Sequence, residues 1–345
     1  MYAQKKHVTL RSLKEELAAK QILDAHITTI NKVLSNIGFH YKKDDNRRAL
    51  MERTSVALAR IEFFRKFIAN QNSSTPRQLV FLNETWIFSK GSKTKSWQDS
   101  SKKSVRKPEG YEGKRFIVLH AGTSEGFVND AALIYSTKSQ LADYHGDMNA
   151  DIFFKWLKEK LIPNLNEPSL IIMDNAPYHS ILIERQPTSL WTKSQIIDWL
   201  ERSNVPFDKD IFKVQLLNIA KSHRKPPRYK VDEFLQEHGH EVLRLPPYHC
   251  QFNAIEMIWA NAKGYYNTHI GEDGYGDDKV IALWEKALQK CTPEVWSATV
   301  RHTLELIQEW YNRECILDKI PEIIINVDDN ESDSESDFSV ISDTE

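Results

Sequence analysis

Runs of apolar residues restrict the fold more than any other feature of this sequence. Residues 78–88 read QLVFLNETWIF, residues 115–123 read RFIVLHAGT, and residues 131–137 read AALIYST. Runs of this length, rich in β-branched and aromatic residues, predict β-strands. A helix predicted over about 150–161 and a buried strand, SLIIMD at 169–174, follow them. This order predicts a mixed α/β sheet flanked by helices.

Two polar residues interrupt the centre of the first strand. Asn83 and Glu84 stand between apolar neighbours on both sides. One explanation is a polar side chain that is satisfied by hydrogen bonds in the core, and the other is an active-site strand. Because side chains alternate along a strand, we expect Asn83 and Glu84 on opposite faces of the sheet unless a bulge intervenes.

The first 45 residues have the pattern of a helix-turn-helix domain. Thr9 is placed to cap a helix over 10–20, and a second helix is predicted over 25–37 with Gly38 closing it. A plain helical hairpin would have the same pattern. The apolar residues Ile27, Ile30, Leu34 and Ile37 are expected to point inward. If the domain binds DNA, the contacts in the major groove are expected from His26, Thr28, Thr29, Asn31 and Lys32.

Composition predicts how the rest of the chain is divided. Residues 46–77 are expected to form a helical linker that packs through Leu50, Val56, Ile61, Phe64 and Phe67 and ends at NSSTP. The α/β core is expected over 78–180 and 240–316, with a helical insertion at 181–239. An acidic tail at 317–345 is expected to be disordered.

A basic segment, residues 90–115, carries nine Lys or Arg residues against three Asp or Glu. A loop of this kind is suited to the phosphate backbone of DNA, whereas a solvated hairpin would have the same composition. The candidate contacts are Lys93, Lys95, Lys102, Lys103 and Arg106.

The overall charge hides an uneven distribution. The formal net charge is -2, but the last 18 residues contain eight Asp or Glu and no Lys or Arg, which leaves the rest of the chain at about +6. A basic body with an acidic tail is compatible with a nucleic-acid partner. Cys250, Cys291 and Cys315 form no pair typical of disulfides or zinc. With neither a signal-type leader nor a membrane-length apolar run, a soluble intracellular protein is expected.

Two acidic residues stand where catalytic carboxylates are often found. Asp174 ends the strand SLIIMD, and Glu256 opens an amphipathic helix within LPPYHCQFNAIEMIWANAK at 245–263. Two such carboxylates can converge on divalent cations that catalyse phosphoryl transfer. The other nearby acids, Asp143, Asp147 and Asp151, are assigned to a loop or a helix start and not to the site.

The ordered segments LNETWIFS, IIMDNAPYH and LPPYHCQFNAIEMIW resemble the catalytic core of Tc1/mariner-type transposases, which are DDE superfamily endonucleases. The resemblance covers most of residues 9–315. It implies an RNase H-like fold preceded by a helix-turn-helix, Mg²⁺ or Mn²⁺ as cofactor, transposon terminal repeats as the DNA partner, a possible homodimer and a nuclear location. Asp174 and Glu256 match the second and third catalytic acids. The first acid falls at residue 83, which is Asn83, so the resemblance implies impaired metal binding and cleavage.

Other departures from the family pattern accompany Asn83. Ala254 replaces a proline at the start of the helix that carries Glu256. The spacing between Asp174 and Glu256 is far longer than in the short-spaced family members. Within the insertion, two helices over about 193–202 and 209–222 weakly resemble a SAP-like DNA-binding module, but we favour an insertion that packs against the core. Family members commonly carry two helix-turn-helix modules, and one is evident here.

The sequence leaves three functions open. The first is a transposase-derived DNA-binding protein that cleaves poorly or not at all, and it rests on Asn83. The second is an active transposase, which needs a compensating carboxylate; Glu84 is not expected to supply it. The third is a co-opted chromatin or regulatory factor that uses the helix-turn-helix for DNA and the acidic tail for protein contacts.

Overall fold

A computed structural model describes residues 8–41, 46–92, 100, 113–136, 148–208 and 210–317. The chain divides into two compact units, Met1–Leu50 and Met51–Glu345. Each unit is described by itself.

The first unit contains two short helices, α1 (Leu10–Ala19) and α2 (Ile27–Asn36). Thr9 caps α1 as predicted, because its hydroxyl accepts a hydrogen bond from the Ser12 amide. Ile30 is buried in α2, but the prediction that Ile37 points inward is wrong, since 62% of this residue is exposed. The helix ends at Asn36, and Gly38 adopts the left-handed φ of 88° that stops it.

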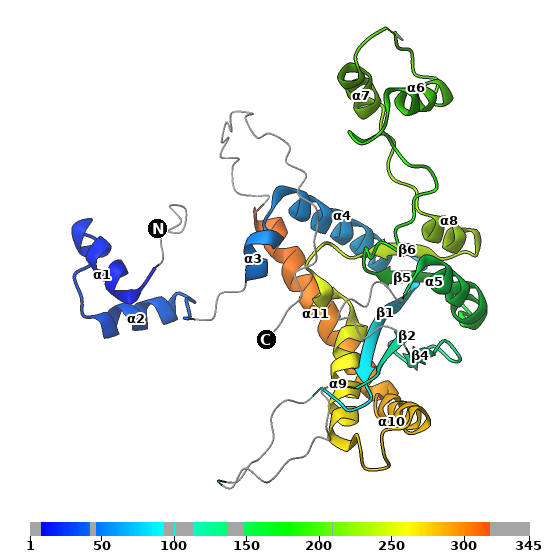
Figure 1. Cartoon of the computed structure of the whole chain (residues 1–345). Coiled ribbons are helices and arrows are strands. Elements are labelled where there is room, and N and C mark those ends of the chain that lie inside the picture. The colour runs from blue at the N-terminus through cyan, green and yellow to red at the C-terminus, as the bar shows by residue number, and fades with distance from the viewer. Residues whose placement is uncertain are drawn as a thin grey trace. The chain divides into compact units, whose positions relative to one another are not determined.

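A mixed sheet forms the centre of the second unit and confirms the predicted fold class (Figure 1). β1 pairs antiparallel with β2 and parallel with β5, and β5 pairs parallel with β6. The order is β3-β2-β1-β5-β6, with β4 paired to β2. This is an RNase H-like arrangement. The strands are β1 (Gln78–Phe88), β2 (Arg115–Thr123), β3 (Gly126–Phe127), β4 (Leu133–Ser136), β5 (Ser169–Met173) and β6 (Glu241–Arg244).

Helices cover both faces of the sheet, and each face has its own hydrophobic cluster. Phe81 and Ile87 of β1 join the cluster beneath the first set of helices, whereas Val80 and Leu82 join the cluster on the opposite face. The first set is α4 (Thr54–Gln71), α9 (Ala254–His269), α10 (Asp277–Gln289) and α11 (Pro293–Leu317). The opposite face is covered by α5 (Ala150–Trp156), its π-helical and 3-10 continuations at Leu157–Leu161 and Ile162–Asn164, and α8 (Lys230–Glu237).

Residues 51–71 of the predicted helical linker belong to the second unit, and Val56, Phe64 and Phe67 are buried there as predicted. The predicted linker contains α3 (Asn46–Met51) and α4, separated at Glu52 and Arg53. Phe63, Phe64 and Phe67 of α4 are buried in the first cluster, and burying each such side chain stabilises the fold by about 1.5–3 kcal/mol.

A buried arginine also joins α4 to α11. Only 1% of Arg60 is exposed, and its Nη2 lies 2.7 Å from Oε1 of Glu314. Arg60 also donates to the Met51 carbonyl at 2.9 Å. Because a buried charge requires its partners in place, α4 cannot act as a free spacer.

The insertion has a small hydrophobic cluster of its own. It contains α6 (Lys193–Arg202) and α7 (Lys213–Ser222), and α7 starts four residues later than predicted. The favoured expectation, an insertion at 181–239 packed against the core, holds for α8, whose Val231 and Leu235 are buried in the cluster on the opposite face of the sheet. The buried members of the insertion's own cluster all belong to α6, α7 and the turn between them. These members are Ile196, Trp199, Leu200, Val205, Leu216, Leu217 and Ala220.

Among the residues that the structure describes, no helix is both long enough and apolar enough to cross a membrane.

Candidate active site

β1 places Asn83 and Glu84 on opposite faces of the sheet, as the alternation of strand side chains predicts. Asn83 pairs with His120 and Glu84 with Leu119 in a register that continues without a bulge from Phe81 to Phe88. Asn83 is half-buried and Glu84 is buried. Glu84 therefore cannot replace a carboxylate on the face that Asn83 occupies.

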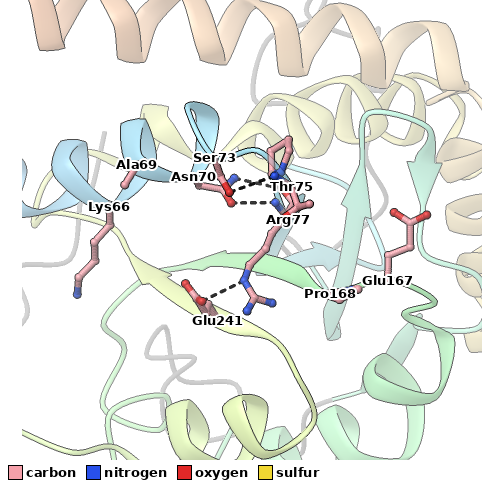
Figure 2. A pocket seen from close by; sticks show the side chains of 10 residues that line it. Lys66, Ala69, Asn70, Ser73, Thr75, Arg77, Glu167, Pro168 and Glu241 are labelled. Atoms are coloured by element: carbon pink, nitrogen blue, oxygen red, sulfur yellow. Dashed lines mark hydrogen bonds and ion pairs between the residues drawn. The ribbon is translucent and has the colours of Figure 1, made fainter.

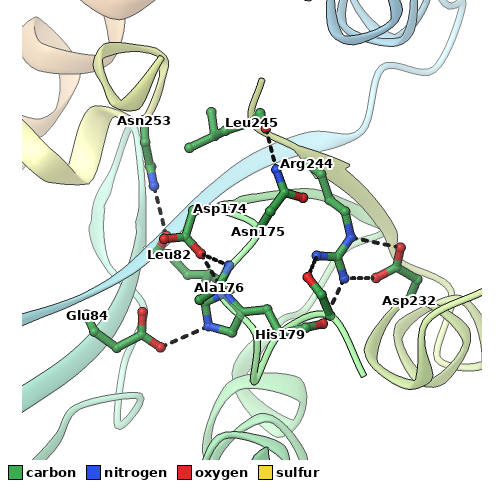
Figure 3. A network of polar contacts seen from close by, with 11 residues as sticks. Leu82, Glu84, Asp174, Asn175, Ala176, His179, Asp232, Arg244, Leu245 and Asn253 are labelled. Atoms are coloured by element: carbon green, nitrogen blue, oxygen red, sulfur yellow. Dashed lines mark hydrogen bonds and ion pairs between the residues drawn. The ribbon is translucent and has the colours of Figure 1, made fainter. Parts of the chain in front are cut away.

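Glu84 is instead connected to Asp174 through a buried histidine (Figure 3). Nε2 of His179 lies 3.0 Å from Oε1 of Glu84, and Nδ1 lies 2.8 Å from Oδ1 of Asp174. The His179 side chain is fully buried, whereas 44% of the Asp174 side chain is exposed. No sequence pattern indicated that His179 would link the loop after β5 to a residue on β1.

The charged forms of His179 and of its neighbouring carboxylates stabilise one another. Burial alone would lower the pKa of His179, but the neighbouring Glu84 and Asp174 carboxylates raise it to about 9. Burial alone would raise the pKa of Asp174, but the hydrogen bond from His179 and its charge lower it. At neutral pH the structure therefore holds an imidazolium between two carboxylates.

This arrangement predicts a dependence of stability on pH. The pKa of His179 is about 9 in the folded protein and 6.5 in the unfolded chain. The stabilisation from protonated His179 is therefore fully present below pH 6.5 and is lost as the pH rises through 9. We expect the free energy of unfolding to fall by up to about 3 kcal/mol over this range. Urea unfolding of the wild type and of His179→Gln at pH 6, 7, 8 and 9.5 measures the free energy of unfolding. The variant should lack the decrease that is due to His179. Parallel curves for the two proteins would contradict the assignment.

The loop after β5 is held in place by backbone and side-chain contacts. Oδ1 of Asp174 accepts a hydrogen bond from the Ala176 amide at 2.9 Å, and the Asn175 side chain donates to the Leu245 carbonyl at 2.7 Å. These bonds fix the direction of the Asp174 carboxylate.

The third acid lies at the start of α9. The Asn253 amide donates to the Leu82 carbonyl at 2.9 Å and so ties this end of α9 to β1. Burial raises the pKa of Glu256, as does the Asp174 carboxylate, whereas Lys263 and a hydrogen bond from Asn83 oppose the rise. The structure therefore brings Asn83, Asp174 and Glu256 together. Ala254 is buried without a visible defect at the position of the family's proline.

Lys263 was not selected from the sequence. It follows Glu256 by two helical turns, which places both residues on one face of α9. Its ammonium group lies 4.8 Å from the centre of the Trp86 ring. Burial lowers the pKa of Lys263, and Glu256 opposes this change. The heptad spacing from a predicted catalytic acid was the signal that could have identified it.

The residues at this site do not fit a pair of divalent cations. Asn83 contributes a neutral amide in place of a charged ligand, and it lies close enough to Glu256 to lower the pKa of that carboxyl. Oδ1 of Asp174 is already bonded to His179 and Ala176. Hard cations such as Mg²⁺ prefer several carboxylate oxygens. Within the described part of the chain, no cluster of three or more His, Cys, Asp or Glu is arranged to hold a metal.

The predicted DNA-binding residues fall into two groups. His26, Thr28, Thr29, Asn31 and Lys32 are all exposed on or just before α2. The His26 ring is also used as a cap, since its Nδ1 accepts from the Thr28 amide at 3.4 Å. The second group lies outside the described residues, as do Asp143, Asp147 and the acidic tail from 318 onward. This group comprises Lys93, Lys95, Lys102, Lys103 and Arg106.

The second unit also has a polar groove of about 680 Å³ away from the three site residues (Figure 2). It lies beside the first residues of β1, β5 and β6, whereas Asp174 follows the end of β5. Arg77 crosses it, with Nε 3.0 Å from Oε1 of Glu241. Since the parallel strands begin at this edge and end at the other, the groove is not part of the candidate active site. It is lined by Lys66, Ala69, Asn70, Ser73, Thr75, Pro76, Arg77, Glu167, Pro168 and Glu241.

The sequence matches no protein-family model and no curated protein. Among solved structures, the crystal structure of the mariner Mos1 paired end complex with Mg is similar over 90% of this chain and 81% of that chain, with 14% identity and a TM-score of 0.49. The paired end complex with Mn matches 90% and 81%, with 13% identity and a TM-score of 0.45. The catalytic domain of Mos1 mariner transposase matches 78% of this chain and 95% of that chain, with 11% identity and a TM-score of 0.38.

Proposed function

We propose that this chain is a transposase-derived DNA-binding protein of DDE fold whose metal-dependent cleavage of DNA is impaired. The observation that carries the proposal is the amide of Asn83, which stands where the resemblance requires the first catalytic acid and is hydrogen-bonded to the third, Glu256. The remaining acids, Asp174 and Glu256, are those that match the family motif.

Loss of the first acid affects chemistry more than folding. An amide in place of a carboxylate removes one negative charge and one anionic oxygen from the site. In a two-metal reaction these ligands hold the cations that activate the nucleophile and stabilise the leaving oxygen. Asn83 is only half-buried, so solvent can hydrate its amide and the strand can tolerate the change.

DNA binding is supported by charge and by the exposed face of α2. Asn31 and Lys32 are exposed there, together with the other short polar residues predicted to reach a major groove. The chain outside its acidic C-terminal segment is basic, which favours contact with a phosphate backbone. A nuclear location belongs to the same proposal, because that is where a DNA-binding protein of this kind would meet its partner.

The alternative of an active transposase requires a substitute for the first acid. Glu84 is the nearest carboxylate along β1, but it lies on the opposite face and contacts His179 at 3.0 Å. We therefore favour the impaired protein.

The proposal is tested with a labelled duplex that carries a transposon terminal repeat and with a scrambled duplex of equal composition. We expect the wild-type chain to bind the duplex in EDTA, measured as a change in its electrophoretic mobility. In Mg²⁺ or Mn²⁺ the wild-type chain should leave the duplex uncut. Asn31→Ala/Lys32→Ala should weaken binding by about 1–3 kcal/mol, whereas Lys20→Ala, at the C-terminal cap of α1, is the exposed control. Selectivity for the repeat indicates a transposon role, and equal affinity for both duplexes indicates co-option. Wild-type cleavage that Asp174→Ala abolishes would contradict the proposal.

A further inference from the structure

The insertion contains a surface that the proposed function does not use. We call residues 183–228 the insertion lobe; it comprises α6, α7 and the segments that join them to the sheet. Its hydrophobic cluster is made of its own residues. The lobe is therefore not required to complete either cluster of the sheet, and its exposed side chains are available for another role.

The end of the lobe, from the last turn of α7 onward, carries positive charge alone, whereas the earlier part of the lobe mixes acidic and basic residues. Residues 221–228 read KSHRKPPR, with four Lys or Arg and no Asp or Glu, and all eight are exposed. Arg228 forms an ion pair with Glu233. Among the described residues, Lys221 and Lys225 have no carboxylate within ion-pair distance. The segment thus presents positive charge that is largely uncompensated.

This basic segment is held against the start of the lobe. Nη2 of Arg224 donates to the Pro187 carbonyl at 2.9 Å, and the Gln186 side chain donates to the Lys225 carbonyl. These bonds fix the backbone around the two lysines. A fixed backbone lowers the conformational cost of placing Lys221 and Lys225 on a ligand.

The lobe joins the sheet through a clamped neck beside Asp174. The Ile183 amide donates to Arg228 at 3.0 Å, and the Lys230 amide donates to Ile181 at 2.9 Å, on either side of a bridge between Leu182 and Tyr229.

Arg244 of β6 secures both strands of this neck (Figure 3). It donates to the His179 carbonyl at 2.8 Å, to the Ser180 hydroxyl at 3.0 Å and to Asp232 at 2.6 Å. Its guanidinium also lies 4.2 Å from the centre of the Tyr229 ring. Because the His179 side chain contacts Asp174, the base of the lobe adjoins the candidate active site.

We propose that residues 221–228 are a second DNA-contacting surface, in which Lys221 and Lys225 bind backbone phosphates of a duplex held by the same chain. The proposal rests on the proposed DNA-binding function. The segment offers positive charge and two prolines but no large apolar side chain, a composition that suits phosphates and lacks the apolar centre of a protein interface. Of the exposed apolar residues of the lobe, Leu190, Phe212 and Val214 lie before or at the opposite end of α7, and Ile183 lies in the neck beside Arg228.

The expected effect is a change in the salt dependence of binding. Each lysine that neutralises a phosphate contributes about 1 to the slope of log affinity against log salt concentration. Lys221→Gln/Lys225→Gln should therefore reduce the slope by about 2 and weaken binding roughly tenfold at physiological salt. Both side chains are exposed, so the fold should be unaffected.

The experiment measures the affinity of the full chain for a duplex of mixed sequence in EDTA between about 50 and 200 mM salt. Lys286→Gln/Lys290→Gln, in the last turn and at the C-terminal cap of α10, removes the same charge from another exposed surface. A smaller slope for the lobe variant alone supports the proposal. Equal slopes for wild type and lobe variant, or equal losses in both variants, overturn it.

Further outcomes also decide the question. If the wild type binds no duplex, both the proposed function and this proposal are overturned. If the wild type binds and the lobe variant binds equally well, only this proposal is overturned. A loss seen with duplex RNA but not with DNA overturns the proposal in favour of RNA. If the lobe variant keeps the wild-type salt dependence on DNA but no longer binds polyglutamate, the proposal is overturned in favour of an acidic protein partner.

Discussion

Asn83→Asp is expected to make the chain a Mg²⁺- or Mn²⁺-dependent endonuclease on its terminal-repeat duplex. The substitution replaces the side-chain amide by a carboxylate of nearly the same shape. It places a third carboxylate beside Asp174 and Glu256 and removes the amide next to Glu256. Metal ions contribute several kcal/mol to such reactions, so strand cleavage should rise at least about 100-fold above the wild type. Gel analysis of nicked products in each metal provides the measurement.

A second readout separates metal binding from catalysis in the same variant. Without metal, three neighbouring carboxylates repel one another, so Asn83→Asp should be less stable than wild type in EDTA, on the order of 1 kcal/mol. Added Mg²⁺ should raise its melting temperature by mass action and leave the wild type unchanged. Asn83→Asp/Asp174→Asn is the matched control and should neither cleave nor respond. An Asn83→Asp variant that shows no metal response would refute our account of residue 83.

His179→Ala is expected to destabilise the second unit by about 3–5 kcal/mol, because it leaves the buried Glu84 carboxylate without its cation. The structure gives Glu84 only 8% exposure, so water cannot replace the lost partner. Urea unfolding at pH 7 measures the loss, with the exposed His302→Ala on α11 as the control.

The cause of that loss can be tested with a double variant. His179→Ala/Glu84→Gln removes the stranded charge and should recover part of the stability relative to His179→Ala alone. If the double variant is no more stable than the single one, packing of the imidazole against Phe153, and not its charge, would account for the effect.

Several parts of the fold and site were predictable because their signals are local. The strand at 78–88, the alternation that separates Asn83 from Glu84, and the cap at Thr9 depend on neighbouring residues only. Recognition of Asp174 and Glu256 came from short motifs. The strand β6 was missed because four residues beside two prolines carry too little periodicity.

The mixed sheet and the neutral side chain at residue 83 were predictable without coordinates, since local patterns and single residues encode both. The contacts between distant groups became evident in the folded chain alone. The structure showed Arg60 of α4 buried against Glu314 of α11, and it showed that α6 and α7 of the insertion share a hydrophobic cluster of their own. It also placed His179 between Glu84 and Asp174, residues 90 positions apart in the chain. Such contacts depend on how strands and helices pack, and no local pattern encodes that packing.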